Sequence, residues 1–270
     1  MWSLIERIKN KLLRAFKGAK AMTLKDQSVF LNNYGWKVVG SSTTNLLISK
    51  NDKKIKIRKD SSTDFEVFKQ IFIHQEYYSV LSFFISNEVK LENMIDAGAN
   101  IGLTSVFIKS MFPDAKIACI EPENENFKVL EENLKSFSVD NSVQLFKAGL
   151  MGVSNLNLTV GSKFRGGGDW AKQTVLSDVD TTLKSISIKN ICEKMNFNYI
   201  DLLKIDIEGA ETFLIEAETD LSFLTFTKVI AIEIHDEYKC RLQINALLNQ
   251  YNFLLIEVGE TTIGINKQLL

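Results

Sequence analysis

The stretch Met94-Ile95-Asp96-Ala97-Gly98-Ala99-Asn100-Ile101-Gly102 decides the fold class of this chain. An apolar strand pattern runs into two glycines and then into an apolar helical pattern over residues 103–112. Gly98 lets the backbone turn tightly with no Cβ in the way of a ligand, and Gly102 permits close approach at the helix start. Asp96 stands at the carboxyl end of the strand, where open α/β sheets bind their ligands. The stretch therefore predicts a ligand site on an α/β sheet.

Strand and helix patterns alternate on the carboxyl side of this stretch. Strands are expected at 116–120, 143–148, 202–207 and 229–234, and helices at 123–137, 211–217 and 238–250. Repeated βα units predict a mostly parallel sheet with helices on both faces. A short link that contains Gly259-Glu260 joins the two last strands, 253–258 and 262–266, and such a short link allows only antiparallel pairing. We therefore expect a mixed sheet.

We expect residues 1–90 to extend the α/β domain of residues 91–270, with contacts to an acceptor molecule or to a second copy in a homo-oligomer. Residues 45–59 are typical of a β-hairpin that turns at Asn51-Asp52. The aromatic-rich residues 64–86 are expected to be helical.

A hairpin insertion is expected at residues 154–188, with strands 156–160 and 184–188 pairing with each other. Gly166–Gly168 would give it a mobile lid, and Trp170 an aromatic surface for a sugar or ring. The alternative is that these glycines form only a disordered hairpin tip.

Composition excludes several classes of protein. The 270 residues are 45% hydrophobic and 24% charged, as in soluble globular proteins, and a net charge of −1 gives no basis for nucleic-acid binding. Three widely spaced cysteines and the lack of a signal-peptide pattern favour a cytoplasmic location.

Residues 2–20 form a basic amphipathic pattern. It fits peripheral contact with an anionic membrane, or packing on the domain or on a partner chain.

The next strand ends in an acidic residue, Glu121, 19 positions after Gly102. At this spacing a carboxylate accepts hydrogen bonds from the two hydroxyls of a ribose, although a surface glutamate is the alternative. In dinucleotide-binding proteins, the motif G-x-G-x-x-G brings a pyrophosphate to a helix N-terminus. In this chain Asn100 stands in place of the middle glycine. S-adenosylmethionine has no phosphate, so Asn100 favours it over NAD as the cofactor.

A second acidic stretch, Leu203–Glu211, ends a later strand. Asp206 should project from the carboxyl edge of the sheet, next to the tip of the first strand. Glu208 and Glu211 add negative charge there, with Lys204 as a partner. Clustered carboxylates raise one another's pKa, bind a cation or serve as a base. The alternative is that Glu208 and Glu211 stabilise a helix N-terminus.

One of the two histidines, His235, follows the buried strand 229–234, between Glu233 and Asp236. A histidine beside a carboxylate can act as a general base near neutral pH, although a lone histidine is more often structural. Together with Asp206 these residues are also compatible with magnesium or another cation that prefers oxygen ligands. A divalent metal is therefore left open.

Four stretches together resemble the FkbM family of S-adenosylmethionine-dependent methyltransferases: IDAGANIGLTSVFI (95–108), IEPENENFKVLEENL (120–134), LLKIDIEGAETFLI (202–215) and AIEIHDEY (231–238). VFKQIFIHQEYYSV (67–80) resembles the segment that precedes the family's domain. The resemblance implies an α/β class I methyltransferase fold, Rossmann-like, with a seven-stranded mixed sheet whose last strand is antiparallel. It also implies methyl transfer to the hydroxyl of a small molecule or glycan, such as a sugar or polyketide.

The resemblance also assigns residues to the S-adenosylmethionine site. Asp96, Gly98 and Asn100 would lie by the methionine part, Glu121 would hold the ribose, Ala148 would border the adenine, and Asp206 would face the reacting centre. The family often has a Leu-Asp-Asp-Leu-like stretch before the KIDIEGAE strand, but this chain has Ile186-Ser187-Ile188-Lys189-Asn190-Ile191.

The expected reaction is an in-line displacement at the sulfonium methyl, for which the acceptor hydroxyl must lose a proton. His235 and Asp206 are the candidate bases, followed by Glu208. Two rival functions remain: an NAD-dependent oxidoreductase, and a methyltransferase-like module that binds without catalysis. Asn100 disfavours the first, and intact Asp96, Gly98 and Glu121 disfavour the second.

Overall fold

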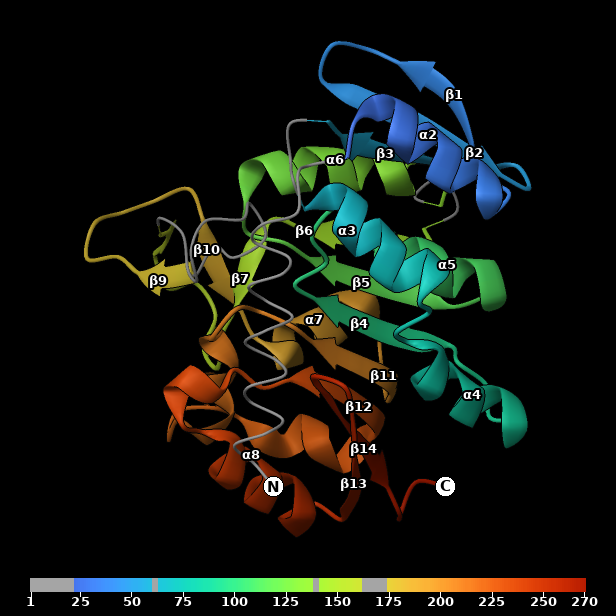
Figure 1. The fold of residues 1–270 in the computed structure, drawn as a ribbon. Coiled ribbons are helices and arrows are strands. Elements are labelled where there is room, and N and C mark those ends of the chain that lie inside the picture. The colour runs from blue at the N-terminus through green and yellow to red at the C-terminus, as the bar shows by residue number, and fades with distance from the viewer. Residues whose placement is uncertain (1–21, 60–62, 138–140, 162–173) are drawn as a thin grey trace.

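The computed structural model describes residues 22–59, 63–137, 141–161 and 174–270 (Figure 1). The expectations for residues 2–20, for Gly166–Gly168 and for Trp170 lie outside these ranges. Within them, every helix is too short or too polar to cross a bilayer.

A seven-stranded sheet forms the centre of the molecule (Figure 1). Its order is β13 (Phe253–Val258), β14 (Thr261–Asn266), β12 (Thr227–Glu233), β11 (Ile200–Ile205), β4 (Asn93–Ala97), β5 (Lys116–Ile120) and β6 (Val143–Phe146). β14 is antiparallel to both of its neighbours, while β12, β11, β4, β5 and β6 are parallel. The prediction of a mixed α/β sheet with a reversed last strand is confirmed.

Hydrophobic side chains fill a core on each face of the sheet. Neighbouring strand residues point to opposite faces, so Met94 enters one core and Ile95 the other. One core lies under α5 (Leu103–Met111), α6 (Asn124–Leu134) and the N-terminal elements. The other lies under α7 (Ile188–Met195), α8 (Arg241–Gln250) and two 3₁₀ helices, η2 (Ala210–Ile215) and η3 (Leu221–Phe226). All six residues of β11 are buried, as expected for a parallel strand covered on both faces.

A small antiparallel sheet lies at the N-terminal side, formed by β1 (Lys37–Ser41), β2 (Asn45–Lys50) and β3 (Lys53–Arg58), with α2 (Leu24–Asn33) before it. The predicted hairpin is confirmed: Asn51 and Asp52 both have positive φ, 49° and 64°, as a two-residue hairpin turn requires. Arg58 pairs with Asp64 and donates to Asn126 of α6, which fixes the small sheet to the domain.

The prediction that residues 64–86 are helical is confirmed except at residues 74–77, where the helical run breaks. The chain forms α3 (Asp64–Phe68), a π turn η1 (Lys69–Ile73) and, after a break, α4 (Tyr78–Ser86). Gln75 has φ 53° and cannot continue a right-handed helix. π turns in proteins often occur at functional sites.

The expected pairing within the insertion is confirmed at one point only, an antiparallel bridge between Asn157 and Lys184. Residues 158–160 (β8, Leu158–Val160) pair with β9 (Thr174–Leu176), whereas β10 (Lys184–Ile186) pairs in parallel with β7 (Ala148–Leu150). Ser187 then caps α7 by accepting from the Asn190 N–H, so residue 188 starts a helix. The expected helices 211–217 and 238–250 are instead η2 and, after the short η4 (Asp236–Tyr238), α8.

Candidate active site

The carboxyl ends of four parallel strands bring the predicted site residues to one edge of the sheet. Asp96 lies in β4, Glu121 follows β5, Asp206 follows β11 and His235 follows β12. The Asp206 N–H donates to Ala97 O at 3.1 Å, which places Asp206 beside the tip of β4 as predicted.

Residues 98–102, between β4 and α5, form a glycine loop. Both of its glycines are required by contacts within the protein. Gly98 has φ 76°, and a Cβ there would lie 1.7 Å from the backbone oxygen of Asp206. Gly102 has φ 84°, and a Cβ there would lie 2.7 Å from the side chain of Leu130 in α6. The glycines therefore join β4 closely to β11 and α5 closely to α6.

Asp96 lies beneath the loop and pairs with Lys204. Asp96 is fully buried, accepts from Ser105 Oγ at 2.7 Å, and has an Oδ1 only 3.1 Å from Lys204 Nζ. Lys204 also donates to Gly98 O at 2.8 Å and lies 3.7 Å from Asp206 Oδ2. Burial lowers the pKa of Lys204, but Asp96, Tyr77 and Asp206 outweigh it and hold that pKa well above its usual value. Lys204 is therefore a fixed cation that ties the loop to two carboxylates.

Glu121 is buried at the tip of β5 and accepts from two backbone amides. Its Oε2 accepts from the Asn100 N–H and its Oε1 from the Glu123 N–H, both at 2.8 Å. Burial outweighs these hydrogen bonds and raises the Glu121 pKa to about 7. Asn100 itself has φ 51°, and its Oδ1 is buried without a hydrogen-bond partner in the described part of the chain.

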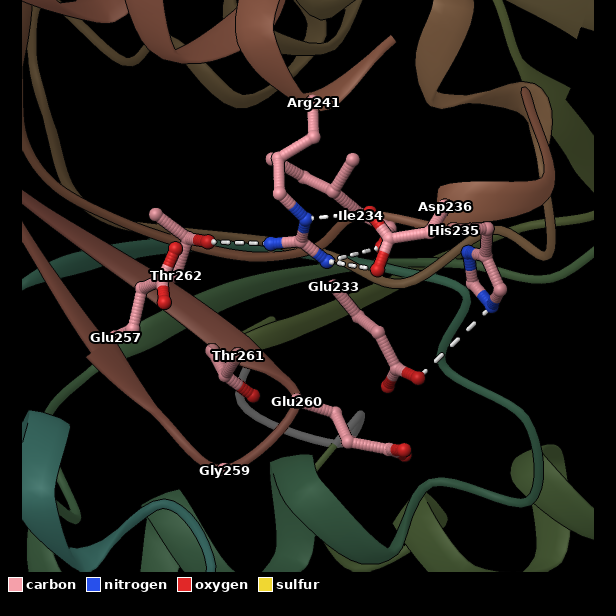
Figure 2. A pocket seen from close by; sticks show the side chains of 10 residues that line it. All are labelled: Glu233, Ile234, His235, Asp236, Arg241, Glu257, Gly259, Glu260, Thr261 and Thr262. Carbon is pink, nitrogen blue, oxygen red and sulfur yellow. Dashed lines mark hydrogen bonds and ion pairs between the residues drawn. The ribbon is translucent and has the colours of Figure 1, made fainter. Parts of the chain in front are cut away.

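Five side chains, Asp206, Glu208, Glu211, Glu233 and His235, form an acid–histidine cluster beside this loop. His235 is 2% exposed, and carboxylates face both of its ring nitrogens. Nδ1 lies 2.9 Å from Glu211 Oε1, and Nε2 lies 3.4 Å from Glu208 Oε2. Nε2 also lies 3.9 Å from Glu233 Oε1 (Figure 2). Glu208 has φ 52°, a left-handed conformation that is uncommon outside glycine and asparagine and occurs at functional sites.

Negative charge accumulates around this cluster. Burial and then the charge of Asp206 raise the pKa of Glu76, of Glu208 and of Glu233, the last to about 8. Burial, the largest cause, and the charge of Asp206 both disfavour the ionised carboxylates, and a cationic ligand would offset both effects.

The same neighbours act in the opposite direction on His235. Burial lowers the pKa of His235, but Glu208 and Glu211 outweigh it and raise that pKa to about 11. The isolated protein therefore holds this imidazole protonated at neutral pH. An imidazolium cannot accept a proton, which weakens the interpretation of His235 as the base.

A hollow of about 200 Å³ adjoins the cluster between β12 and the β13–β14 turn (Figure 2). Glu233, His235, Glu257, Glu260 and Thr262 are among its lining residues. Arg241 crosses the hollow and binds Asp236 at 2.6 Å and Ile234 O at 2.7 Å. Asp236 therefore faces Arg241, although the sequence grouped it with His235.

Two residues of this region were not singled out from the sequence. The break between η1 and α4 brings Glu76 and Tyr77 into electrostatic contact with Lys204 and Asp206. The only sign of them in the sequence is that Glu76 is an acidic residue within the aromatic-rich residues 64–86. Ala148, expected near adenine, is buried at the start of β7, just past β6.

Comparison with known proteins adds an independent observation. Residues 96–255 match the model of the methyltransferase FkbM domain. Methyltransferase sdnD of Sordaria araneosa is 26% identical over 211 residues, which cover 67% of this chain and 81% of that protein. Methyltransferase 1 of Beauveria bassiana is 25% identical over 159 residues, 52% of this chain and 64% of that protein.

Solved structures with a similar fold include two methyltransferases. A putative caffeoyl-CoA O-methyltransferase from Staphylococcus aureus has a TM-score of 0.45 at 12% identity, covering 74% of this chain and 91% of that one. Precorrin-6y C5,15-methyltransferase from Geobacter metallireducens has a TM-score of 0.40 at 13% identity, covering 80% and 94%.

Proposed function

Because the chain belongs to the FkbM methyltransferase family, we propose that it transfers the methyl group of S-adenosylmethionine to a hydroxyl of a small molecule or glycan. One observation carries the choice of cofactor: the glycine loop opens onto an edge rich in carboxylates, among them Asp206, Glu208 and Glu233. S-adenosylmethionine is cationic at its sulfonium and ammonium groups, whereas NAD carries a pyrophosphate. The sign of the charge at this edge favours the sulfonium compound.

The polar atoms at the loop fit this cofactor. Asn100 Oδ1 is a buried acceptor that needs a donor, and an ammonium group supplies one. Glu121 keeps its carboxylate at the tip of β5, at the spacing for a ribose diol. Ala148 would border the adenine, and Asp206 would face the methyl group. These roles remain proposals for this chain.

The protein's own residues would act mainly by holding and orienting. When bound, the cofactor supplies an electrophilic methyl group. Lys204, held by Asp96 and by Gly98 O, fixes the loop relative to β11. The acceptor hydroxyl would enter from the hollow beside His235, in line with the carbon–sulfur bond. Its proton would pass to a carboxylate of the acid–histidine cluster, because both ring nitrogens of His235 already face carboxylates.

Calorimetry of the full chain with S-adenosylmethionine, S-adenosylhomocysteine and NAD tests the cofactor. We expect both adenosyl compounds to bind and NAD not to bind. Binding of NAD alone would establish the oxidoreductase alternative, and binding of none of the three would leave a methyltransferase-like module without a cofactor.

The acceptor class needs a separate assay. A panel of hydroxyl, amine and thiol compounds, incubated with methyl-labelled cofactor, should show label on hydroxyl oxygen. Label found only on nitrogen or sulfur would contradict O-methylation and leave the cofactor assignment intact.

A further inference from the structure

We propose that Asp206, Glu208 and the Nε2 of His235 bind one divalent transition-metal ion at the carboxyl edge of the sheet. Each of the three residues offers a ligand atom, and these atoms lie within 4.8 Å of one another. The ion's role in catalysis rests on the proposed function, but its binding does not.

The two sides of the His235 ring differ in a way that favours a metal on one side. Nδ1 lies at ordinary hydrogen-bond distance from Glu211, 2.9 Å, while Nε2 lies 3.4 Å from Glu208 Oε2. Zinc-type bonds of about 2.0–2.2 Å in a tetrahedral site place neighbouring ligand atoms about 3.4 Å apart. The Nε2 side therefore has the spacing of two ligands around an ion.

Glu208 supplies a second, independent observation. Its Oε2 is buried and has no hydrogen-bond partner of good geometry in the described part of the chain. Its nearest cation is the protonated His235 ring, whose Nε2 lies 3.4 Å away, and a metal ion bound between these two atoms would take the place of that proton. The left-handed backbone of Glu208, φ 52°, aims this side chain at His235.

Glu211 completes the arrangement behind His235. It is fully buried, and its Oε1 accepts from the N–H groups of Gly209 and Ile207 at 3.2 and 3.4 Å, besides facing His235 Nδ1. Histidines that bind a metal usually donate their other N–H to a carboxylate, which fixes the tautomer and the ring orientation. Glu211 is thus a positioning residue that points Nε2 toward the ion.

The ligand set indicates the kind of ion. One imidazole and two carboxylates suit Zn²⁺ or Mn²⁺ better than Ca²⁺, which takes six or more oxygen ligands. Asp206 is about a third exposed, so the ion stays accessible to an acceptor arriving through the hollow.

An ion here would bind the acceptor hydroxyl and make it easier to deprotonate. The proton of the acceptor hydroxyl would pass to a carboxylate of the acid–histidine cluster. The acceptor oxygen would form a bond to the methyl carbon while the carbon–sulfur bond breaks, and the electron pair of that bond would stay on sulfur. The reaction needs no oxidant or reductant.

The test is a Mn²⁺ titration of tag-free, chelator-treated full chain, followed by the electron paramagnetic resonance of free Mn²⁺, with Zn²⁺ as competitor. We expect one Mn²⁺ to bind per chain, and we expect Zn²⁺ to displace it. Asp206→Asn, Glu208→Gln and His235→Gln should each weaken binding at least about 100-fold, and Glu211→Gln about 10- to 100-fold. Asp236→Asn is the matched control: it removes an adjacent carboxylate that faces Arg241, and it should leave Mn²⁺ affinity unchanged.

Circular dichroism and thermal melts establish that each variant is folded, and Glu208→Gln, which changes only charge, is the variant to rely on if others unfold. Absence of a stoichiometric site, or equal affinity in wild type and Glu208→Gln, would overturn the proposal. Calorimetry with S-adenosylmethionine on the same samples separates the two proposals. Cofactor binding without Mn²⁺ binding sinks the metal site alone, whereas Mn²⁺ binding without cofactor binding sinks the proposed function and keeps the site.

Discussion

Gly98 and Gly35 share a backbone conformation and differ in their surroundings. Both have φ 76°, but a Cβ at Gly35 would meet only the flexible end of Lys50 at 3.6 Å, whereas at Gly98 it would overlap the Asp206 backbone oxygen. Gly35→Ala should cost about 1–2 kcal/mol of unfolding free energy, the cost of left-handed backbone. Gly98→Ala should cost about 4 kcal/mol or more and weaken cofactor binding.

Urea denaturation of both variants provides the measurement. Equal losses of stability would mean that β4 and β11 do not approach as closely at this loop as we describe.

The buried carboxyl of Glu121 predicts how cofactor affinity depends on pH. Its pKa is raised from 4.5 to about 7 by burial, and the ribose hydroxyls donate to its ionised form. Affinity for S-adenosylhomocysteine should therefore be constant above about pH 8 and fall by up to about tenfold per unit below pH 7. Calorimetry from pH 5.5 to 8.5 measures this, with Glu121→Gln as a control that should bind weakly and lack the dependence. A wild-type profile as flat as that of the variant would remove Glu121 from the ribose site.

The same pKa shift affects the protein without ligand. Because the folded-state pKa lies above the unfolded value, the contribution of protonated Glu121 to stability is fully present below about pH 4.5 and is lost as pH rises through about 7.

At the scale of elements, Asp201 fastens three strands at the amino edge of the sheet, opposite the candidate site. It is fully buried at the start of β11, accepts from the N–H groups of Glu92 and Asn93 at 2.8 Å, and binds Lys228 of β12 at 2.7 Å. Asp201→Ala should cost about 1–3 kcal/mol of stability, since it removes the acceptor of two part-buried N–H groups and of the Lys228 ammonium. Cofactor affinity, measured below the melting temperature, should change less than twofold, and a large loss of affinity would show that the two edges are coupled.

Elements were predictable where the burial pattern alone decides them. The strands 116–120 and 253–258 were placed to the residue, because each is a short, largely apolar run bounded by turn residues. Gln75 and Glu208 adopt positive φ, which the local propensity of glutamine and glutamate disfavours, so the sequence could not place the break after η1 or the turn before η2. The pairing of the insertion was only partly predictable for a related reason: beyond the Asn157–Lys184 bridge, β10 pairs with the non-local β7, and short strands carry little register information.

For the whole molecule, topology explains how much of the site could be predicted. Parallel strands end at one edge, so Asp96, Glu121, Asp206 and His235 were expected together and lie together. The details that decide chemistry come from packing across the sheet. Carboxylates on both sides of His235 and the approach of Glu76 depend on segments far apart in sequence, and no local pattern encodes them.

We propose that S-adenosylmethionine is held at the carboxyl edge of the sheet. Hydrogen–deuterium exchange of the full chain with and without saturating cofactor tests it most directly. We predict slower amide exchange in residues 98–102, 121–126 and 206–211, and unchanged exchange in the small sheet of β1–β3. Protection confined to β1–β3, or no protection at these loops despite saturation, would contradict the account.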